Sequence, residues 1–236
     1  MLTLGAKFLA AVACPRLIRS RIVFEKEPLR KAPARPTVVQ RRGVERGQAI
    51  LNAAETLLGE DGYEAATLKA IGERAGIPTA SLYHYFADRH QVEAELVQRH
   101  LRELDARVVA ALENRNLRTL RDAIDAVIDP YLAYFREHPD FIQLWFAGRN
   151  PTLGELARAF DDSQANQLWR FLIDQNLILA DTPEFVVQLA FEVGNRLFDV
   201  AFRRSPTGDD TTIDEARRLL TAYLETYATR SPKRRK

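Results

Sequence analysis

TLKAIGERAGIPTASLYHYFADR, residues 67–89, holds two short apolar patterns that are separated by a Gly and then a Pro. In the first half, Leu68, Ile71 and Ala75 share one face at helical spacing. Thr67 stands where a residue would cap the start of that helix. Gly76 follows the last apolar residue, a position where Gly commonly ends a helix. We therefore predict a helix over about 68–75 that stops in a tight turn.

The second half of the stretch continues with a helix that starts near residue 79 and carries many hydrogen-bonding side chains. Ile77, Leu82 and Phe86 have the spacing of an inward face, and no acidic residue occurs between Gly76 and Asp88. Such a helix either presents an unusually polar outer face or lies against a partner rich in hydrogen-bond acceptors. Two helices joined by a tight turn that contains Gly form a helix-turn-helix, whose second helix enters the major groove of DNA.

The net charge of +2 hides an uneven distribution along the chain of 236 residues. Residues 1–46 carry 11 Lys/Arg against 3 Asp/Glu, and the last seven carry 5 Lys/Arg and no acidic residue. The ranges 47–100 and 101–229 carry 4 against 8 and 14 against 21. The positive charge therefore lies at the two ends of the chain, where it can attract a polyanion such as DNA.

The first 46 residues contain four prolines and no sustained helical or strand periodicity, and we interpret residues 1–40 as a flexible basic arm. The opening MLTLGAKFLAAVACP imitates a signal peptide, so the alternative is an exported or lipoprotein-like helical interaction protein without DNA binding. Lys7 interrupts the apolar run, which is too short to span a membrane. We therefore expect a cytoplasmic protein with no membrane partner.

From Arg46 onward the apolar spacing is helical, and no stretch alternates as a strand would. Capping patterns mark several helix starts, at Asp88–Gln91, Thr152–Glu155, Thr182–Pro183 and Thr212–Glu215. The expected helices cover about 46–61, 68–75, 79–86, 88–111, 117–135, 138–147, 152–175, 183–202 and 212–228. The sequence thus predicts an all-α fold of about nine helices.

Residues 46–92 resemble the DNA-binding domain of the TetR family of bacterial repressors. The similar residues are an IL.AA..L....G helix, then T...I...AG, then LY.YF with a basic residue three positions after the Phe. The resemblance implies an all-α homodimer that pairs through its last two helices and binds double-stranded DNA at a palindromic operator. It also implies a C-terminal domain that binds a small-molecule effector. Gly72 departs from the family pattern, which usually has Ala there.

The resemblance assigns roles to individual residues of the helix-turn-helix. Thr67, Tyr83, Tyr85 and Arg89 match positions that contact the DNA backbone, and Thr79, Ala80 and Ser81 match positions that face the bases. Arg42 and Arg46 precede the first helix closely enough to reach phosphate or the minor groove. The expected DNA-binding set is Arg42, Arg46, Thr67, Thr79, Ala80, Ser81, Tyr83, His84, Tyr85 and Arg89.

The expected domain division follows these elements. We predict a flexible arm over 1–40, a helix-turn-helix domain over 41–100 with its motif at about 66–85, and an effector-binding and dimerisation domain over 101–229. Residues 230–236, RSPKRRK, form a basic tail.

Aromatic side chains are frequent in the C-terminal half, where they either fill the core or line a ligand cavity. Interleaved polar residues would supply the few convergent contacts that a small-molecule site needs. Gly194 in mid-helix suggests a close approach of another helix or of a ligand. The candidate ligand-binding residues are Tyr131, Phe135, Trp145, Arg149, Trp169, Phe191 and Asn195.

The sequence offers no pattern typical of catalysis or of a resident cofactor. Cys14 is the single cysteine, which excludes an internal disulfide and a Cys-based zinc site. No two of His84, His90, His100 and His138 have the i, i+4 spacing of a helical ligand pair, so we expect exposed histidines and no metal. Neither a nucleophile motif nor a Gly-rich phosphate loop occurs. We predict a DNA-binding repressor that is not an enzyme and needs no cofactor.

Overall fold

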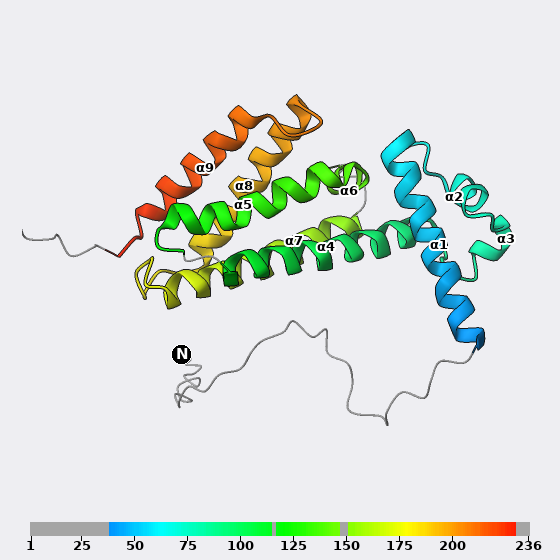
Figure 1. Cartoon of the computed structure of the whole chain (residues 1–236), viewed down its shortest axis with the longest axis horizontal. Helices are drawn as coiled ribbons and strands as arrows, with labels where there is room; N and C mark the ends of the chain where they lie inside the picture. Colours follow the sequence, from blue (N-terminus) through cyan, green and yellow to red (C-terminus); the bar gives the residue numbers. More distant parts are fainter. Residues whose placement is uncertain (1–37, 115–116, 147–150, 230–236) are drawn as a thin grey trace, which may run out of the picture.

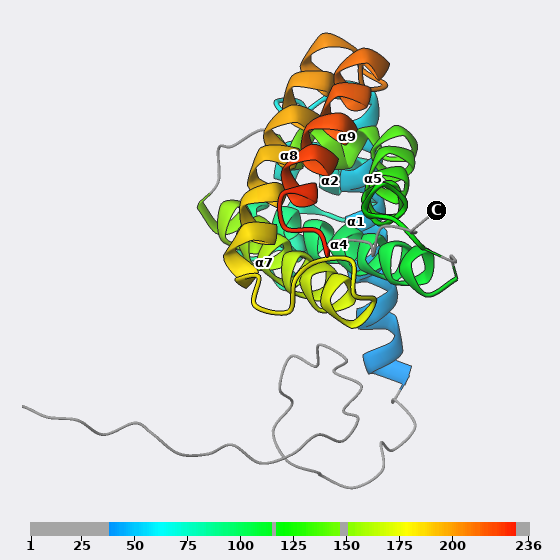
Figure 2. The same cartoon turned by 90° about the vertical axis from the view of Figure 1, so that its left-hand side faces the viewer.

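A computed structural model describes residues 38–114, 117–146 and 151–229. These residues form nine α-helices and no strand, which confirms the predicted all-α class. Figure 1 shows an elongated molecule in which α1, α2 and α3 gather at one end, while α8 and α9 lie toward the other. The long helix α4 runs between the two ends, and Figure 2 shows α5, α8 and α9 packed over α4 and α7.

The N-terminal end consists of α1 (Val38–Asp61), α2 (Leu68–Ala75) and α3 (Thr79–Leu82). The predicted caps of α2 are confirmed: the Thr67 hydroxyl oxygen accepts from the Ala70 amide at 3.2 Å, and Gly76 adopts a left-handed φ of 65°. Leu82 and Phe86 are buried as their spacing predicts, and they pack with α1 and α4 in the core of this end.

The first helix begins eight residues earlier than predicted. α1 starts at Val38, so Arg42 and Arg46 lie on the helix itself and do not precede it. Both side chains are exposed. The last proline of the basic segment is at position 36, so no proline interrupts the residues from Val38 onward. Residues 1–37 of the predicted arm lie outside the described residues.

Helix α3 is shorter than the predicted 79–86. It covers four residues, and the chain then continues in turns whose amides bond back to carbonyls three or four residues earlier, such as Tyr85 N to Leu82 O at 2.8 Å. Pro78 occupies the N-cap and supplies no side-chain hydrogen bond. The predicted segment is therefore one short helix followed by turns.

Helix α4 (Arg89–Asn114) starts where the capping pattern predicts, because Asp88 Oδ1 accepts from the Gln91 amide at 2.9 Å. The helix continues without interruption through residue 100, where we expected the boundary between two domains. Leu96, Leu104 and Val108 are buried along its length. α4 therefore contributes to the packing of both ends of the molecule.

The C-terminal part consists of α5 (Leu120–Glu137), α6 (Pro139–Trp145), α7 (Pro151–Asp174), α8 (Glu184–Arg204) and α9 (Asp210–Glu225). Tyr134, Phe135 and Phe141 are fully buried where α5 and α6 meet. Arg217 joins α9 to α5 by donating to Asp125 at 2.5 Å and to Asp129 at 2.6 Å. These contacts make α5 a central element of this part.

Three helix starts differ from the predicted ones. α7 begins at Pro151, one residue before the expected cap at Thr152, and α8 begins at Glu184 with Pro183 as its N-cap. The cap of α9 is Asp209, whose carboxylate accepts from the Thr212 amide at 2.9 Å. A carboxylate three residues before an amide caps as well as a Thr does, and the prediction had overlooked it.

Among the described residues, no helix is long and apolar enough to cross a membrane.

Candidate nucleic-acid interface and ligand cavity

The predicted base-facing residues lie at the outer surface of α3. Ala80 is exposed, and Thr79 and Ser81 are half-buried, so each of these two residues contacts the protein with part of its surface and leaves the rest accessible. Tyr83 keeps 59% of its surface exposed and is therefore not part of the core. His84 is exposed next to it, and Tyr85 is half-buried and packs against the core. This end of the molecule thus presents hydroxyl groups and an imidazole without an acidic side chain on the same short segment.

Gly72 determines how closely α2 approaches α3. A Cβ atom at this position would lie 2.7 Å from Leu82 Cδ1 and 2.9 Å from the Ile77 carbonyl oxygen. The Ile77 amide also donates to the Gly72 carbonyl at 2.9 Å. The turn is therefore folded tightly over residue 72, where a residue without a side chain fits.

Arg89 makes several intramolecular contacts. Its Nε donates to Glu93 Oε1 at 2.6 Å, its Nη2 donates to the Tyr63 carbonyl at 2.5 Å, and its guanidinium lies 4.1 Å from the centre of the Tyr63 ring. The side chain is 22% exposed. Because guanidinium carries five N–H groups, the two hydrogen bonds leave three for other acceptors. Arg89 thus connects the start of α4 to the α1–α2 loop, while some of its N–H groups can still donate to another acceptor.

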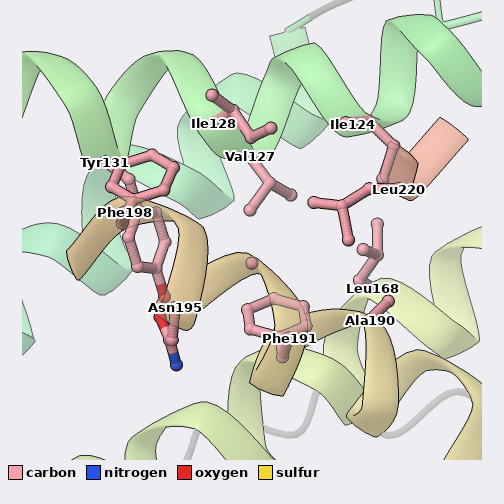
Figure 3. A pocket seen from close by; sticks show the side chains of 11 residues that line it. Ile124, Val127, Ile128, Tyr131, Leu168, Ala190, Phe191, Asn195, Phe198 and Leu220 are labelled. Atoms are coloured by element: carbon pink, nitrogen blue, oxygen red, sulfur yellow. The ribbon is translucent and has the colours of Figure 1, made fainter. Parts of the chain in front are cut away.

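An apolar cavity lies between α5, α7, α8 and α9 (Figure 3). It has a volume of about 50 Å³, counted as the space open to the centre of a water molecule. Its lining residues are Ile124, Val127, Ile128, Tyr131, Leu168, Ala190, Phe191, Gly194, Asn195, Phe198 and Leu220. Figure 3 shows Tyr131 and Phe198 together at one end, near Asn195, while Phe191 and the aliphatic side chains occupy the rest.

Two buried polar groups without partners are associated with the polar end of the cavity: Tyr131 lines it, and Asp161 accepts a hydrogen bond from the lining residue Asn195. Neither the buried Tyr131 hydroxyl nor Asp161 Oδ1 has a hydrogen-bond partner within the described part of the chain. Asn195 Nδ2 donates to the other oxygen of Asp161 at 2.7 Å. Burial raises the pKa of Asp161 to about 7; the negative charge of Glu192 adds to this shift, and the Asn195 hydrogen bond opposes it. A ligand with a hydrogen-bonding group could satisfy this end of the cavity.

The cavity includes three of the seven predicted ligand-binding residues, namely Tyr131, Phe191 and Asn195, together with Gly194. Phe135, Trp145 and Trp169 do not line it: Phe135 is a fully buried core residue, and the Trp169 indole donates to the Thr182 carbonyl. Arg149 lies outside the described residues. The aliphatic lining residues were missed because nothing in their sequence distinguishes them from core positions.

The expectation of exposed histidines is wrong for His100, whose side chain is only 2% exposed, and for His138, which is half-buried. The two imidazole rings lie with their centres 5.2 Å apart, although 38 positions separate the residues in the sequence (138 − 100). Their proximity arises from the packing of α4 against the junction of α5 and α6, which residue spacing within a single helix cannot reveal.

An apolar stripe runs along the outer surface of α8. Phe185, Leu189 and Val193 follow one another at four-residue intervals, and all three are exposed, as is Leu219 on the neighbouring α9. Exposed apolar side chains in such a contiguous arrangement usually mark a surface that another protein chain covers.

The fold and the helix-turn-helix surface define a DNA-binding transcriptional regulator. The chain matches the family model for bacterial regulatory proteins of the tetR family over residues 50–96, and the model for a tetracyclin repressor-like C-terminal domain over residues 119–224. A solved TetR-family transcriptional regulator from Streptomyces coelicolor is 33% identical, with a TM-score of 0.59 over 77% of this chain and 99% of that one. The protein belongs to the TetR family, and its identification as a regulator that is not an enzyme is thereby confirmed.

Two curated relatives are similar over shorter segments. The transcriptional activator FasR of Mycolicibacterium smegmatis is 32% identical over 108 residues, which cover 42% of this chain and about half, 49%, of FasR. The transcriptional repressor KstR of Rhodococcus jostii is 33% identical over 63 residues, 27% of this chain and 30% of KstR. One of these relatives is named an activator and the other a repressor.

Proposed function

We propose that this regulator is a cytoplasmic repressor that binds a palindromic operator as a homodimer and leaves it when a small, mostly apolar effector enters the cavity. The observation that carries the proposal is the joint presence of an acid-free α3 surface at one end of the molecule and an apolar cavity with unsatisfied polar groups at the other. A chain with both features can make DNA binding depend on a ligand.

On the DNA side, Thr79, Ala80 and Ser81 would read base edges in the major groove, because they occupy the exposed start of the recognition helix. The exposed Tyr83 and His84 and the hydroxyls of Thr67 and Tyr85 would contact the sugar-phosphate backbone. Arg89 would add a phosphate contact through its remaining N–H groups.

Arg42 and Arg46 would contact the DNA backbone from the exposed start of α1. Since they are four positions apart on one helix, their side chains lie on the same face. On a helix these two residues would form a defined pair of phosphate contacts, whereas the sequence alone placed them before the first helix.

The homodimer would form through α8 and α9. The exposed stripe of Phe185, Leu189 and Val193, with Leu219 beside it, supports this assignment because burying it against a second copy would remove four large apolar side chains from water. Light scattering coupled to size exclusion should return twice the 26.8 kDa chain mass at micromolar concentration. A mass of one chain would contradict the assignment.

Selection of bound duplexes from a random DNA pool tests the DNA-binding proposal directly. We expect a palindromic consensus with two half-sites that match the two subunits. Thr79→Ala and Ser81→Ala should each cost about 1–3 kcal/mol on the operator and relax preference at one symmetric pair of positions. Ser163 lies on α7, and Ser163→Ala is the matched control, which should change neither the operator affinity nor the base preference. A consensus without two-fold symmetry would overturn the operator proposal.

The cavity can be tested with the neutral apolar dye Nile red before the effector is known. We expect the wild-type protein to bind the dye, and Gly194→Leu to lose binding because a larger side chain would fill the space next to Leu220. Gly154→Leu, at a helical glycine on α7 outside the cavity lining, is the control and should bind as the wild type does. Compounds that displace the dye should then cause the protein to release the operator. Displacement of the dye without any change in operator affinity would contradict the proposal that the cavity controls DNA binding.

A further inference from the structure

Three potential metal-binding side chains meet at the contact between the helix-turn-helix end and the C-terminal part. Glu55 belongs to α1, His100 to α4, and His138 to the junction of α5 and α6. One potential ligand atom of each residue lies within 4.8 Å of the corresponding atoms of the other two. The three residues are distant in sequence, so only the packing of α1, α4 and α6 brings them together.

A fourth donor, Asp140, adjoins this group. Its Oδ2 lies 2.9 Å from His100 Nε2, and its Oδ1 lies 3.9 Å from His138 Nδ1. Both Asp140 Oδ2 and His100 Nε2 are buried, yet neither has a hydrogen bond of acceptable geometry within the described residues, even to the other. The two atoms thus form a close, buried ion pair without a well-aligned hydrogen bond, and an ion bound beside them would satisfy both.

The donor types and their proximity fit a shared metal ion. Zinc binds histidine nitrogen and carboxylate oxygen at about 2.0–2.2 Å, so two of its ligand atoms lie about 3.4 Å apart in a tetrahedral site. The observed 2.9 Å between His100 Nε2 and Asp140 Oδ2 is shorter than that value, and the ligand atoms of Glu55, His100 and His138 lie within 4.8 Å of one another, so side-chain rotations would be needed to bring all four donors around one ion. Glu55 and His138 are both partly accessible, which leaves a route for an ion to enter.

The surrounding groups hold His100 in place. The Tyr134 hydroxyl lies 2.8 Å from His100 Nδ1, and the Phe141 ring stacks against the imidazole with the ring centres 4.7 Å apart. Histidines that bind metals usually have their second nitrogen hydrogen-bonded, because this fixes the orientation of the ring. Arg99 forms an ion pair with Glu55 and so restrains its carboxylate.

We propose that Glu55, His100, His138 and Asp140 bind one divalent transition-metal ion such as Zn²⁺. Two imidazoles favour zinc, cobalt or nickel over magnesium and calcium, which prefer a shell of oxygen atoms. The ion would join α1, which carries part of the DNA-binding end, to α4 and to the α5–α6 junction. It is separate from the effector cavity, since none of its four ligands lines that cavity.

Metal titration of the untagged full-length protein, stripped with a chelator, tests this proposal. Titration calorimetry and metal analysis after dialysis should give one Zn²⁺ per chain, and Co²⁺ should produce the visible absorption of a low-symmetry site. Saturating Zn²⁺ should raise the melting temperature by several degrees, because the ion binds the folded state. Amide exchange should slow in α1 and α6, which the ion joins.

Glu55→Gln and His138→Gln are the informative variants, because both side chains are partly exposed and their replacement need not disturb the core. Each should weaken Zn²⁺ binding at least tenfold and abolish the thermal shift, while circular dichroism confirms an unchanged fold. His90→Gln removes an exposed histidine, and Cys14→Ser removes the only thiol; both should bind zinc as the wild type does. Zinc binding that persists in the double variant E55Q/H138Q, or that disappears in Cys14→Ser, would overturn the assignment, as would the absence of stoichiometric metal in the wild type.

Discussion

Replacing Gly72 with Ala tests whether the tight α2–α3 turn requires a residue without a side chain. The new Cβ would lie 2.7 Å from Leu82 Cδ1 and 2.9 Å from the Ile77 carbonyl oxygen. Leu82 is fully buried and the Ile77 oxygen belongs to the backbone, so neither neighbour can move away at little cost. Inserting a methyl group into such a space typically costs about 1–3 kcal/mol. Gly to Ala within a helix would by itself stabilise by up to about 1 kcal/mol.

Gly59→Ala supplies the matched control for this prediction. It makes the same exchange within α1, where the added Cβ would contact its nearest neighbours at an ordinary 3.8 Å or more. Because both variants share the gain in helix propensity, the difference between their unfolding free energies isolates the steric cost, and we expect it to be about 1–3 kcal/mol. Urea unfolding followed by circular dichroism measures this difference.

The same substitution should weaken operator binding, because relief of the overlap would shift α3 relative to α2. Binding titrations of Gly72→Ala and Gly59→Ala on the selected operator measure this effect at a protein concentration where both are folded. Equal stabilities for the two variants, within about 0.5 kcal/mol, would refute the reasoning. In that case the turn at Gly72 would have room for a Cβ.

Two further predictions concern charged side chains of the C-terminal part. Because the pKa of Asp161 is raised to about 7 in the native state, that state keeps a proton that the unfolded state releases, so the free energy of unfolding should fall as pH rises from about 4 to about 7. Asp161→Asn should remove this fall, and at pH 8 its free energy of unfolding should exceed that of the wild type by up to about 4 kcal/mol. Urea midpoints at pH 5 and pH 8 measure this, and parallel pH profiles for the two proteins would contradict it. Arg217→Met should cost about 1.5–3 kcal/mol, because it leaves Asp125 and Asp129 without their shared donor. Arg218→Met, at an exposed ion pair, should lower the free energy of unfolding by less than about 1 kcal/mol. Equal losses of stability in the two variants would contradict the expected larger contribution of Arg217.

Local features of the sequence predicted the helix-turn-helix well. Leu82 and Phe86 follow a helical period, and Thr67 and Gly76 are residue types that begin and end helices for reasons confined to a few neighbouring residues. After α7, Asn176 adopts a left-handed φ of 53°, a conformation that Asn tolerates better than most residues. Short-range stereochemistry was therefore sufficient for the presence and type of most helices.

Contacts between distant segments were outside the reach of this reasoning. The partners of Arg89, on Glu93 and on the Tyr63 carbonyl, depend on how the α1–α2 loop meets the start of α4. The burial of His100 depends on the junction of α5 and α6, and the ligand cavity depends on four helices together. Aromatic side chains such as Trp169 were candidates for the cavity because a large ring packs equally well in a core, and only the tertiary structure distinguishes the two.

The continuity of α4 limits how sensor and DNA-binding parts of such regulators can be exchanged. The two matched family models end and begin at residues 96 and 119, yet most of the interval between them is one helix and not a linker. Inserting a single residue in α4 would turn everything after it by about 100° around the helix axis. Leu104 and Val108 would then leave the core. A functional chimaera must therefore be joined within α4 in the same helical register, so the useful unit of recombination includes the helix as well as the domains on either side.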